Sequence, residues 1–236
     1  MNEAPRRTYD VVGTIAESPG VTTLHILSEG LKIAFTPGQF ITVYFPELHV
    51  PEGKAYSISS SPDEPTLTIT IKAMGAFSQR LCAMQAGDSF VGSDPYGFFY
   101  SEEKNTPLVM LAIGIGVTPF RSLIRHYLTE EPERDILLCQ GSRTRDDRIF
   151  TKEFSSLETR YPHIRVKHFI SREPDVSAGF EKGRMTAERV LSLTQNADTA
   201  EFMLCGSISF VRDMWRGLRA AEVAEERIYT EAFFTN

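Results

Sequence analysis

The pattern of apolar and polar positions changes character near the middle of the chain. Residues 9–92 form short β-rich segments separated by turn residues, and apolar Leu67, Ile69 and Ile71 alternate with polar neighbours. A period of two is typical of a strand with one buried face. The pattern predicts an antiparallel β-barrel or sandwich with one helix at 77–84. Its expected strands are 9–16, 21–28, 39–45, 56–60 and 67–72.

Beyond residue 105, apolar strands alternate with amphipathic helices. Five strands joined by four helices predict an α/β, doubly wound parallel sheet, whose ligands bind beyond the carboxyl ends of the strands. The polar run 101–107 indicates a boundary, which gives domains at 1–103 and 104–236. The expected strands are 108–113, 136–139, 166–170, 202–205 and 228–231, with helices that begin at 119, 152, 187 and 208.

Composition and charge limit the classes of protein to which this chain could belong. A chain of 236 residues with 42% apolar and 24% charged residues is typical of a folded two-domain protein. The longest mainly apolar stretch, 108–120, is shorter than the roughly 20 residues of a membrane-spanning helix, so no span is expected. The first nine residues lack the apolar core of a secretory signal, which predicts a cytoplasmic protein. The net charge of −6 argues against nucleic acid as the main ligand.

The cysteines and arginines are distributed differently along the chain. Cys82, Cys139 and Cys205 are too widely spaced for an iron–sulfur or zinc site, so we expect no metal in this chain. In contrast, 11 of the 18 arginines lie between Arg121 and Arg189. An anionic ligand of the second domain would explain that enrichment.

The segment Gly114–Pro119 follows an apolar strand and begins a helix. Thr118 can act as N-cap and Pro119 as first helical residue, so backbone N–H groups and the helix dipole would face an anionic ligand. A tight turn without a ligand is the alternative, because a GxG pattern is weak evidence alone.

Two segments of the first half could hold a second anionic or planar ligand. Lys54–Ser57 places a cation, an aromatic ring and a hydroxyl on one strand, whereas Gly75–Ser78 begins the first helix. Taken separately, they are better explained as a polar edge strand and a capped helix start.

Together these motifs resemble the ferredoxin-NADP reductase superfamily, in the same order and over nearly the whole chain. Gly38–Phe40 resembles the GQF strand of that family, 54–57 its RxYS flavin motif and 75–78 its GxxS phosphate turn. Residues 94–99 are similar to its GPxGxF bend and 114–119 to its GxGxxP loop. Further landmarks match at 141–143, 171–172, 183–184, 205–206 and 231–233.

The resemblance implies a role for each matching residue. Tyr56 would pack on the isoalloxazine of the flavin, Ser57 would lie near its reactive N5, and Cys205 and Glu231 would border the nicotinamide, so Ser57, Cys205 and Glu231 are the expected reaction-site residues. No covalent catalysis by Cys205 is expected. The remaining expected cofactor-binding residues are Lys54, Ala55, Ile71, Lys72, Gly75, Ala76, Phe77, Ser78, Gly114, Gly116, Thr118, Arg143, Ser171, Arg172, Arg184 and Phe233.

The cofactors follow from the same resemblance. Lys54 replaces the usual arginine and lacks its planar two-pronged contact with phosphate, so FAD is expected with FMN as the alternative. Ile113 also stands where a glycine is common. Arg143, Arg172 and Arg184 predict NADPH, which carries a 2′-phosphate, rather than NADH; the alternative is that they are solvated surface charges.

The resemblance predicts a reductase that transfers a hydride from nicotinamide C4 to flavin N5 and passes electrons to a separate protein. Expected acceptors are a ferredoxin, a flavodoxin or the iron–sulfur component of an oxygenase. One alternative is the reductase module of a larger, NADH-dependent oxygenase-type system. A second is a non-catalytic nucleotide-binding module, against which the presence of Tyr56, Ser57, Thr118 and Glu231 weighs.

Overall fold

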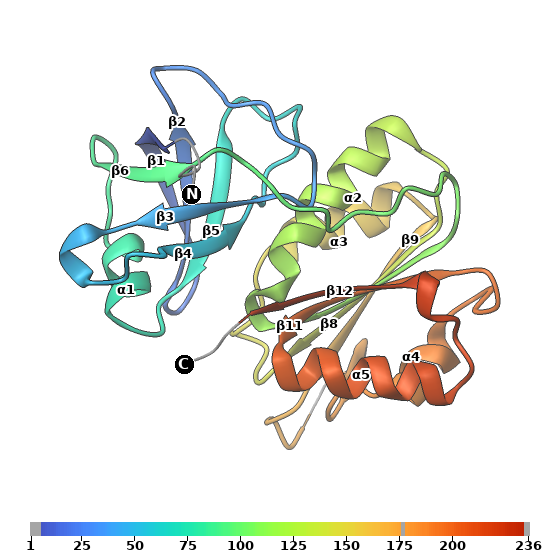
Figure 1. The fold of residues 1–236 in the computed structure, drawn as a ribbon. Helices are drawn as coiled ribbons and strands as arrows, with labels where there is room; N and C mark the ends of the chain where they lie inside the picture. Colours follow the sequence, from blue (N-terminus) through green and yellow to red (C-terminus); the bar gives the residue numbers. More distant parts are fainter. Residues whose placement is uncertain (1–5, 176–177, 234–236) are drawn as a thin grey trace. The chain divides into compact units, whose positions relative to one another are not determined.

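A computed structural model describes residues 6–175 and 178–233. The chain divides into two compact units (Figure 1). Unit 1 extends to Phe98 and also contains Thr118–His126, whereas unit 2 contains Phe99–Val117 and the chain from Tyr127 onward. Helix α2 (Thr118–Glu130) therefore contributes its first nine residues to unit 1. The sequence had suggested a single boundary after residue 103.

Unit 1 is a six-stranded antiparallel sheet in the order β4-β3-β6-β1-β2-β5. Ile58, directly after β4, forms a bridge with Ile69 of β5, and the Ser59 N–H donates to the Thr68 carbonyl at 2.8 Å. These contacts join the two end strands, so the predicted antiparallel barrel is confirmed. Its elements are β1 (Arg6–Ser18), β2 (Val21–Leu27), β3 (Phe40–Tyr44), the 3₁₀ turn η1 (Pro46–Leu48), β4 (Lys54–Ser57), β5 (Leu67–Lys72), α1 (Ala76–Cys82) and β6 (Ser89–Ser93).

The core of unit 1 follows the alternation that the sequence displays. Leu67, Ile69 and Ile71 are buried, and apolar residues of β2 and β3 join them in one cluster. Helix α1 adds Phe77 and Leu81 to the same cluster. The helix is thus fixed beside the strands by burial of its apolar side, which positions the start of α1 near β4.

Unit 2 is a parallel sheet in the order β10-β9-β8-β7-β11-β12. The predicted count of five strands was wrong by one, because β10 has only three residues, too few to show a period. Its elements are β7 (Leu108–Ile113), η2 (Gly114–Val117), the end of α2, β8 (Ile136–Ser142), α3 (Thr151–Arg160), β9 (Ile164–Ile170), β10 (Phe180–Lys182), α4 (Ala187–Leu193), β11 (Glu201–Ser207), α5 (Ile208–Ala220), η3 (Glu225–Arg227) and β12 (Ile228–Phe233).

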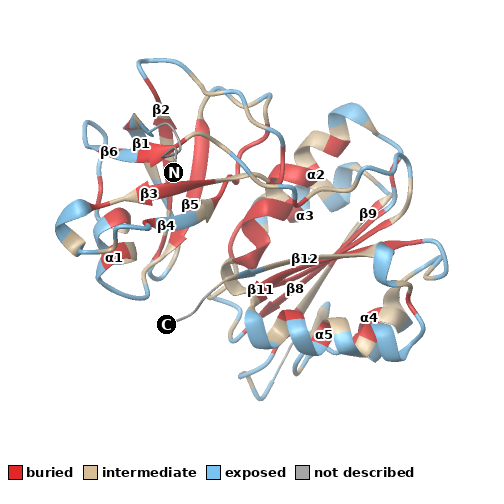
Figure 2. Cartoon of the chain, viewed as in Figure 1, coloured by how far each residue is buried: buried red, intermediate tan, exposed pale blue. Residues whose placement is uncertain are grey.

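The central strands of unit 2 are buried along almost their whole length, as Figure 2 shows for β8 and β11. Leu111, Leu137 and Leu204 pack with Met214 and Leu218 of α5, and Figure 1 shows α3 on the opposite face. Burial on both faces explains the continuous apolar runs in these strands. From β7 the chain proceeds through β8, β9 and β10, then returns to β11 on the other side of β7. The predicted doubly wound sheet is confirmed, and its strand order reverses between β7 and β11.

Among the described residues, no helix combines the length and the apolar character that crossing a bilayer requires.

Candidate functional site

The first group of expected residues lies in unit 1, where β4 runs beside α1. Lys54 and Tyr56 alternate onto the same face of β4, and Tyr56 packs against the barrel core opposite Ile41. The Lys54 ammonium lies 5.9 Å from the centre of the Phe77 ring of α1. Lys54 is exposed and makes no ion pair within the part of the chain that the structure describes. Its charge is therefore available to an anionic ligand.

Tyr56 and Ser57 differ in their surroundings. Burial, with a smaller contribution from Cys82, raises the pKa of the Tyr56 hydroxyl well above its usual value, so this group keeps its proton and can donate. Ser57 is buried on the neighbouring position and pairs with Phe40 of β3. Tyr56 and Ser57 are consecutive residues at the end of β4, so their side chains leave opposite faces of the strand. The Tyr56 ring shares its face with Lys54.

The turn before α1 is ordered by its own serine. The Ser78 hydroxyl accepts the N–H groups of Met74 at 2.9 Å and Gly75 at 3.1 Å, and it donates to the Gly75 carbonyl. A Cβ on Gly75 would meet no atom within 4 Å, so the space in front of the turn is open. Ser78 thus shapes the turn, while Lys54 supplies the charge. Ile71 is buried and Lys72 half-buried at the end of β5, and Ala76 is exposed at the start of α1.

The second group lies in unit 2, where the strand order reverses. A Cβ on Gly116 would come within 2.3 Å of the Cys205 carbonyl oxygen and 2.9 Å of the Gly206 nitrogen. Only glycine therefore allows the turn after β7 to pack on the end of β11. Gly114 has a left-handed φ of 54°, and a Cβ there would meet nothing within 4 Å. This turn faces open space at the switch point, the usual ligand position in such sheets.

The ends of β11 and β12 complete that edge of the sheet. Cys205 pairs with Glu231, and Ser207 pairs with Phe233. Cys205 is fully buried, and burial together with the Glu231 charge raises the pKa of its thiol well above the usual value. The side chain is therefore a small neutral group and not a nucleophile. Thr118, the remaining expected residue of this loop, is buried as the first residue of α2 and belongs to unit 1.

The third group follows β8, β9 and β10. The Arg172 N–H donates to the Arg143 carbonyl at 2.8 Å, and the Ser171 N–H donates to the Ser142 carbonyl at 3.1 Å. Gly183, directly before Arg184, likewise donates its N–H to the Ile170 carbonyl at 2.7 Å. These bonds bring the predicted arginines to one edge of the sheet.

Their charges are not equally available. Arg143 forms an exposed ion pair with Asp147 at 3.4 Å. Arg172 and Arg184 are exposed and have no ion pair among residues 6–175 and 178–233. Two guanidinium groups are thus available to an anion at this edge.

Part of the arginine enrichment has another cause. The sequence suggested an anionic ligand, but four of these arginines bind carboxylates of the protein itself. The pairs are Arg121 with Glu64, Arg134 with Glu131 and Glu201, Arg145 with Glu173, and Arg189 with Glu181.

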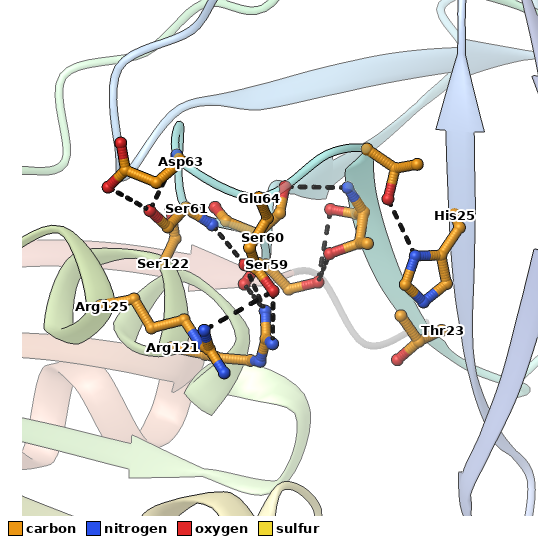
Figure 3. Close-up of polar contacts among 12 residues, drawn as sticks. Thr23, His25, Ser59, Ser60, Ser61, Asp63, Glu64, Arg121, Ser122 and Arg125 are labelled. Carbon is orange, nitrogen blue, oxygen red and sulfur yellow. Dashed lines mark hydrogen bonds and ion pairs between the residues drawn. The ribbon is translucent and has the colours of Figure 1, made fainter. Parts of the chain in front are cut away.

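One of these pairs was missed as a functional candidate. Arg121 and Ser122 of α2 contact the segment after β4, as Figure 3 shows. Glu64, the partner of Arg121, is 57 residues away in sequence, and no local pattern relates two such residues.

Comparisons with known proteins agree with this arrangement. Residues 110–215 match the family model of the oxidoreductase NAD-binding domain. The flavohemoprotein of Bordetella pertussis is 28% identical over 248 residues, which cover 97% of this chain and 61% of that protein. The flavohemoprotein of Bacillus subtilis is 30% identical over 229 residues, covering 92% of this chain and 56% of the relative. The chain thus spans less than two thirds of either relative.

Solved structures share the two-domain fold. The flavohem-like FAD/NAD-binding domain of nitric oxide dioxygenase from Vibrio cholerae superposes with a TM-score of 0.86 at 24% identity, covering 96% of this chain and 98% of that domain. A ferredoxin NADP+ reductase from Neisseria gonorrhoeae with bound FAD and NADP gives a TM-score of 0.81 at 21% identity, covering 98% and 100%.

Proposed function

We propose that this chain, a member of the ferredoxin-NADP reductase superfamily, is a flavoprotein reductase that oxidises a nicotinamide dinucleotide and passes the electrons to a separate acceptor. When bound, the flavin would take a hydride from the nicotinamide C4 at its N5 and release the two electrons singly. The protein's own contribution is to bind both cofactors and to fix their orientation.

The observation that carries the proposal is the face of β4 beside α1. Lys54 and Tyr56 share this face, and the Lys54 ammonium lies 5.9 Å from the ring of Phe77. The exposed Lys54 ammonium, which has no ion pair among the described residues, suits a phosphate, and the Tyr56 ring suits the face of an isoalloxazine. A Cβ on Gly75 would meet no atom within 4 Å, so a phosphate can approach the backbone of this turn. These residues fit a flavin, and the FAD named for similar solved structures supports FAD over FMN.

The test is the visible spectrum of the purified protein, recorded before and after anaerobic addition of NADPH. We expect a yellow protein that bleaches, and acid extraction that releases FAD. A colourless protein that takes up neither FAD nor FMN would contradict the proposal and would favour a non-catalytic nucleotide-binding module.

We propose NADPH as the hydride donor because Arg172 and Arg184 are exposed without a carboxylate partner among the described residues. A 2′-phosphate is the charged group that distinguishes NADPH from NADH, and guanidinium groups bind it with two parallel hydrogen bonds. The paired Arg172→Met and Arg184→Met variant should lower kcat/KM for NADPH by about tenfold or more. Its kcat/KM for NADH should stay unchanged, and an equal fall with both donors would contradict this assignment.

We infer that the acceptor is a one-electron carrier. Similar solved structures include a reductase named for an Amycolatopsis cytochrome P450 system and the ferredoxin reductase of carbazole 1,9a-dioxygenase. We infer an acceptor of the same kind, namely a ferredoxin, a flavodoxin, an iron–sulfur oxygenase component or a haem domain. Reduction of each under anaerobic conditions, with catalytic amounts of this protein and NADPH, identifies the class, and the preferred acceptor should give the highest kcat/KM.

A further inference from the structure

The first nine residues of α2 are joined to unit 1 by a buried arginine–carboxylate contact. Arg121 donates to Glu64 through both terminal nitrogens, at 2.9 and 3.0 Å, and to the Ser59 carbonyl at 2.7 Å (Figure 3). The side chains of Arg121 and Glu64 are 12% and 22% exposed. A two-pronged contact in such surroundings fixes both orientation and distance, unlike an exposed ion pair.

A second bond lies next to the first. The Ser122 hydroxyl donates to the Ser60 carbonyl at 2.6 Å, and both residues are fully buried. Two successive residues of α2 therefore bind two successive carbonyls of the segment after β4. We call Arg121, Ser122 and Glu64, with the carbonyls of Ser59 and Ser60, the α2 clamp.

Hydrogen bonds to β5 also hold Ser59 and Ser60, the clamp residues that follow β4. The Ser59 hydroxyl contacts Thr68 and Thr70 of β5 at 2.8 and 2.9 Å, and the Ser60 hydroxyl accepts the Thr68 N–H at 2.9 Å. The chain of hydroxyls continues from Thr70 to Thr23 at 2.8 Å. A fully satisfied buried polar network is rigid, so Ser59 and Ser60 form a fixed base for α2.

Glu64 is held in place as firmly. The Ser61 N–H donates to one carboxylate oxygen at 2.7 Å, and the Lys32 ammonium donates to the Glu64 carbonyl at 2.7 Å. Burial alone would raise the pKa of Glu64, but its bonds to Arg121 and Ser61 and the charge of Arg125 outweigh burial and hold the pKa below the usual value. The carboxylate therefore stays charged at neutral pH.

The place of the clamp along the chain gives it a role. Its strand side begins two residues after Ser57, at the end of the proposed flavin strand. Its helix side begins three residues after Thr118, which ends the proposed dinucleotide turn. Thr118 and Ser57 both belong to unit 1, and the clamp joins the segment after Ser57 to the helix turn after Thr118.

We propose that Arg121, Glu64 and Ser122 are positioning residues for hydride transfer, which hold Thr118 at a fixed offset from Tyr56 and Ser57. The proposal rests on the reductase function inferred above. Hydride transfer depends steeply on the separation of donor and acceptor atoms, and a displacement of about 1 Å can lower the rate about 100-fold. Arginine is required because the ammonium of lysine cannot bind Glu64 with two parallel bonds and also reach the Ser59 carbonyl.

The test compares Arg121→Met and Glu64→Gln with the parent protein in anaerobic stopped flow. We expect the first-order rate of flavin reduction at saturating NADPH to fall about 10- to 100-fold in Arg121→Met. The dissociation constant of the dinucleotide and the flavin content should change less than about twofold, because neither Arg121 nor Glu64 is among the proposed cofactor-binding residues. The variant that combines Arg121→Met with Glu64→Gln should reduce its flavin no more slowly than Arg121→Met alone, since both substitutions remove the same interaction.

A matched control and a second readout separate positioning from general loosening. Arg212→Met removes an exposed ion pair of α5 with Asp213 and should leave the rate unchanged. Amide hydrogen exchange of the purified protein should accelerate at 118–126 in Arg121→Met and stay unchanged at 208–220. Arg121→Lys, which keeps the charge, should give an intermediate rate.

The outcomes are distinct. An Arg121→Met protein that exchanges faster at 118–126 but reduces its flavin at the parent rate would overturn the positioning role. If that variant loses flavin or does not fold, the rates of Arg121→Lys and Glu64→Gln decide, and parent rates in both would overturn the role equally. A parent protein without flavin would instead overturn the reductase function, and this inference with it.

Discussion

Two arginines, one in each unit, bind their surroundings in different ways. Arg121 lies within helix α2, and Arg134 follows its C-terminal end. Arg121 in unit 1 pairs with Glu64 and keeps slight exposure. Arg134 in unit 2 is completely buried between Glu131 and Glu201, at 3.2 and 3.4 Å, and also donates to the Thr106 carbonyl at 2.7 Å.

Arg134 also has further contacts that distinguish it from Arg121. Its guanidinium lies 4.6 Å from the centre of the Tyr127 ring and donates to the Ser101 hydroxyl. Ser101 and Tyr229 both donate to Glu201. Arg134 thus fixes the segment before β7 to the sheet of unit 2, so its removal affects the fold. Arg121 fixes one helix end beside one strand, so its removal affects mainly where that helix end lies.

The largest expected effect is on the Arg134 side of the comparison. Arg134→Met should lower the free energy of unfolding by about 3 to 5 kcal/mol, because the buried Glu201 and the half-buried Glu131 would lose their cation. Urea unfolding followed by circular dichroism measures the change. A loss no greater than that of Arg121→Met would remove the distinction between the two arginines.

Glu64→Gln tests the other side and should cost less, about 2 kcal/mol at pH 7, since the amide retains part of the hydrogen bonding. The folded-state pKa of Glu64 lies below its unfolded value, so its contribution is present above about pH 4.5 and is lost as the pH falls through the folded pKa. The difference between the two proteins should therefore disappear in acid. A difference that stays constant from pH 7 to pH 3 would show that the Glu64 charge does not stabilise unit 1.

His168 of β9 provides a further test in unit 2, because it lacks the kind of partner that Arg134 has. Its Nδ1 atom is buried and has no hydrogen-bond partner among the described residues. Burial, together with the charge of Arg148, lowers the pKa of His168 to about 4. The unfolded chain then binds the proton first, so stability is lost as the pH falls from about 6.5 towards 4, by about 1 kcal/mol or more. His168→Phe, next to Phe180, should lose less stability between pH 7.5 and pH 5 in urea unfolding. Equal losses would contradict this account.

The smallest effect is expected from Arg212→Met. Arg212 and Asp213 are 53% and 64% exposed, and exposed ion pairs contribute about 0 to 1 kcal/mol. Thermal unfolding should give nearly the parent midpoint. A large shift would show that exposure does not separate structural arginines from incidental ones in this protein.

The sequence predicted most of the fold because its signals are local. The alternation of Leu67, Ile69 and Ile71 and the apolar runs of unit 2 each identify a strand by themselves. β6 and β10 were missed, because Ser89–Ser93 contains a glycine among its five residues and β10 has only three. The fold and the family resemblance are confirmed, whereas the cofactor roles of single residues remain predictions.

The candidate sites were predictable only where a motif is contiguous. Gly116 is recognisable from its neighbours in sequence, although its contact with Cys205 is not. The α2 clamp depends on a contact between Arg121 and Glu64, which are 57 residues apart in sequence. The serine-rich segment that contains Glu64 resembles an ordinary turn, so no local pattern indicates this contact.

Helix α2 also has a consequence for the exchange of modules between related reductases. Unit 1 is discontinuous in sequence, because Thr118–His126 returns to it after the first strand of unit 2. A recombinant that replaces only the first hundred residues would set a foreign loop against Arg121 and Ser122 of the host. Successful gene shuffling therefore requires two crossovers, one on each side of this helix segment, or a donor whose loop already carries a carboxylate at the position of Glu64.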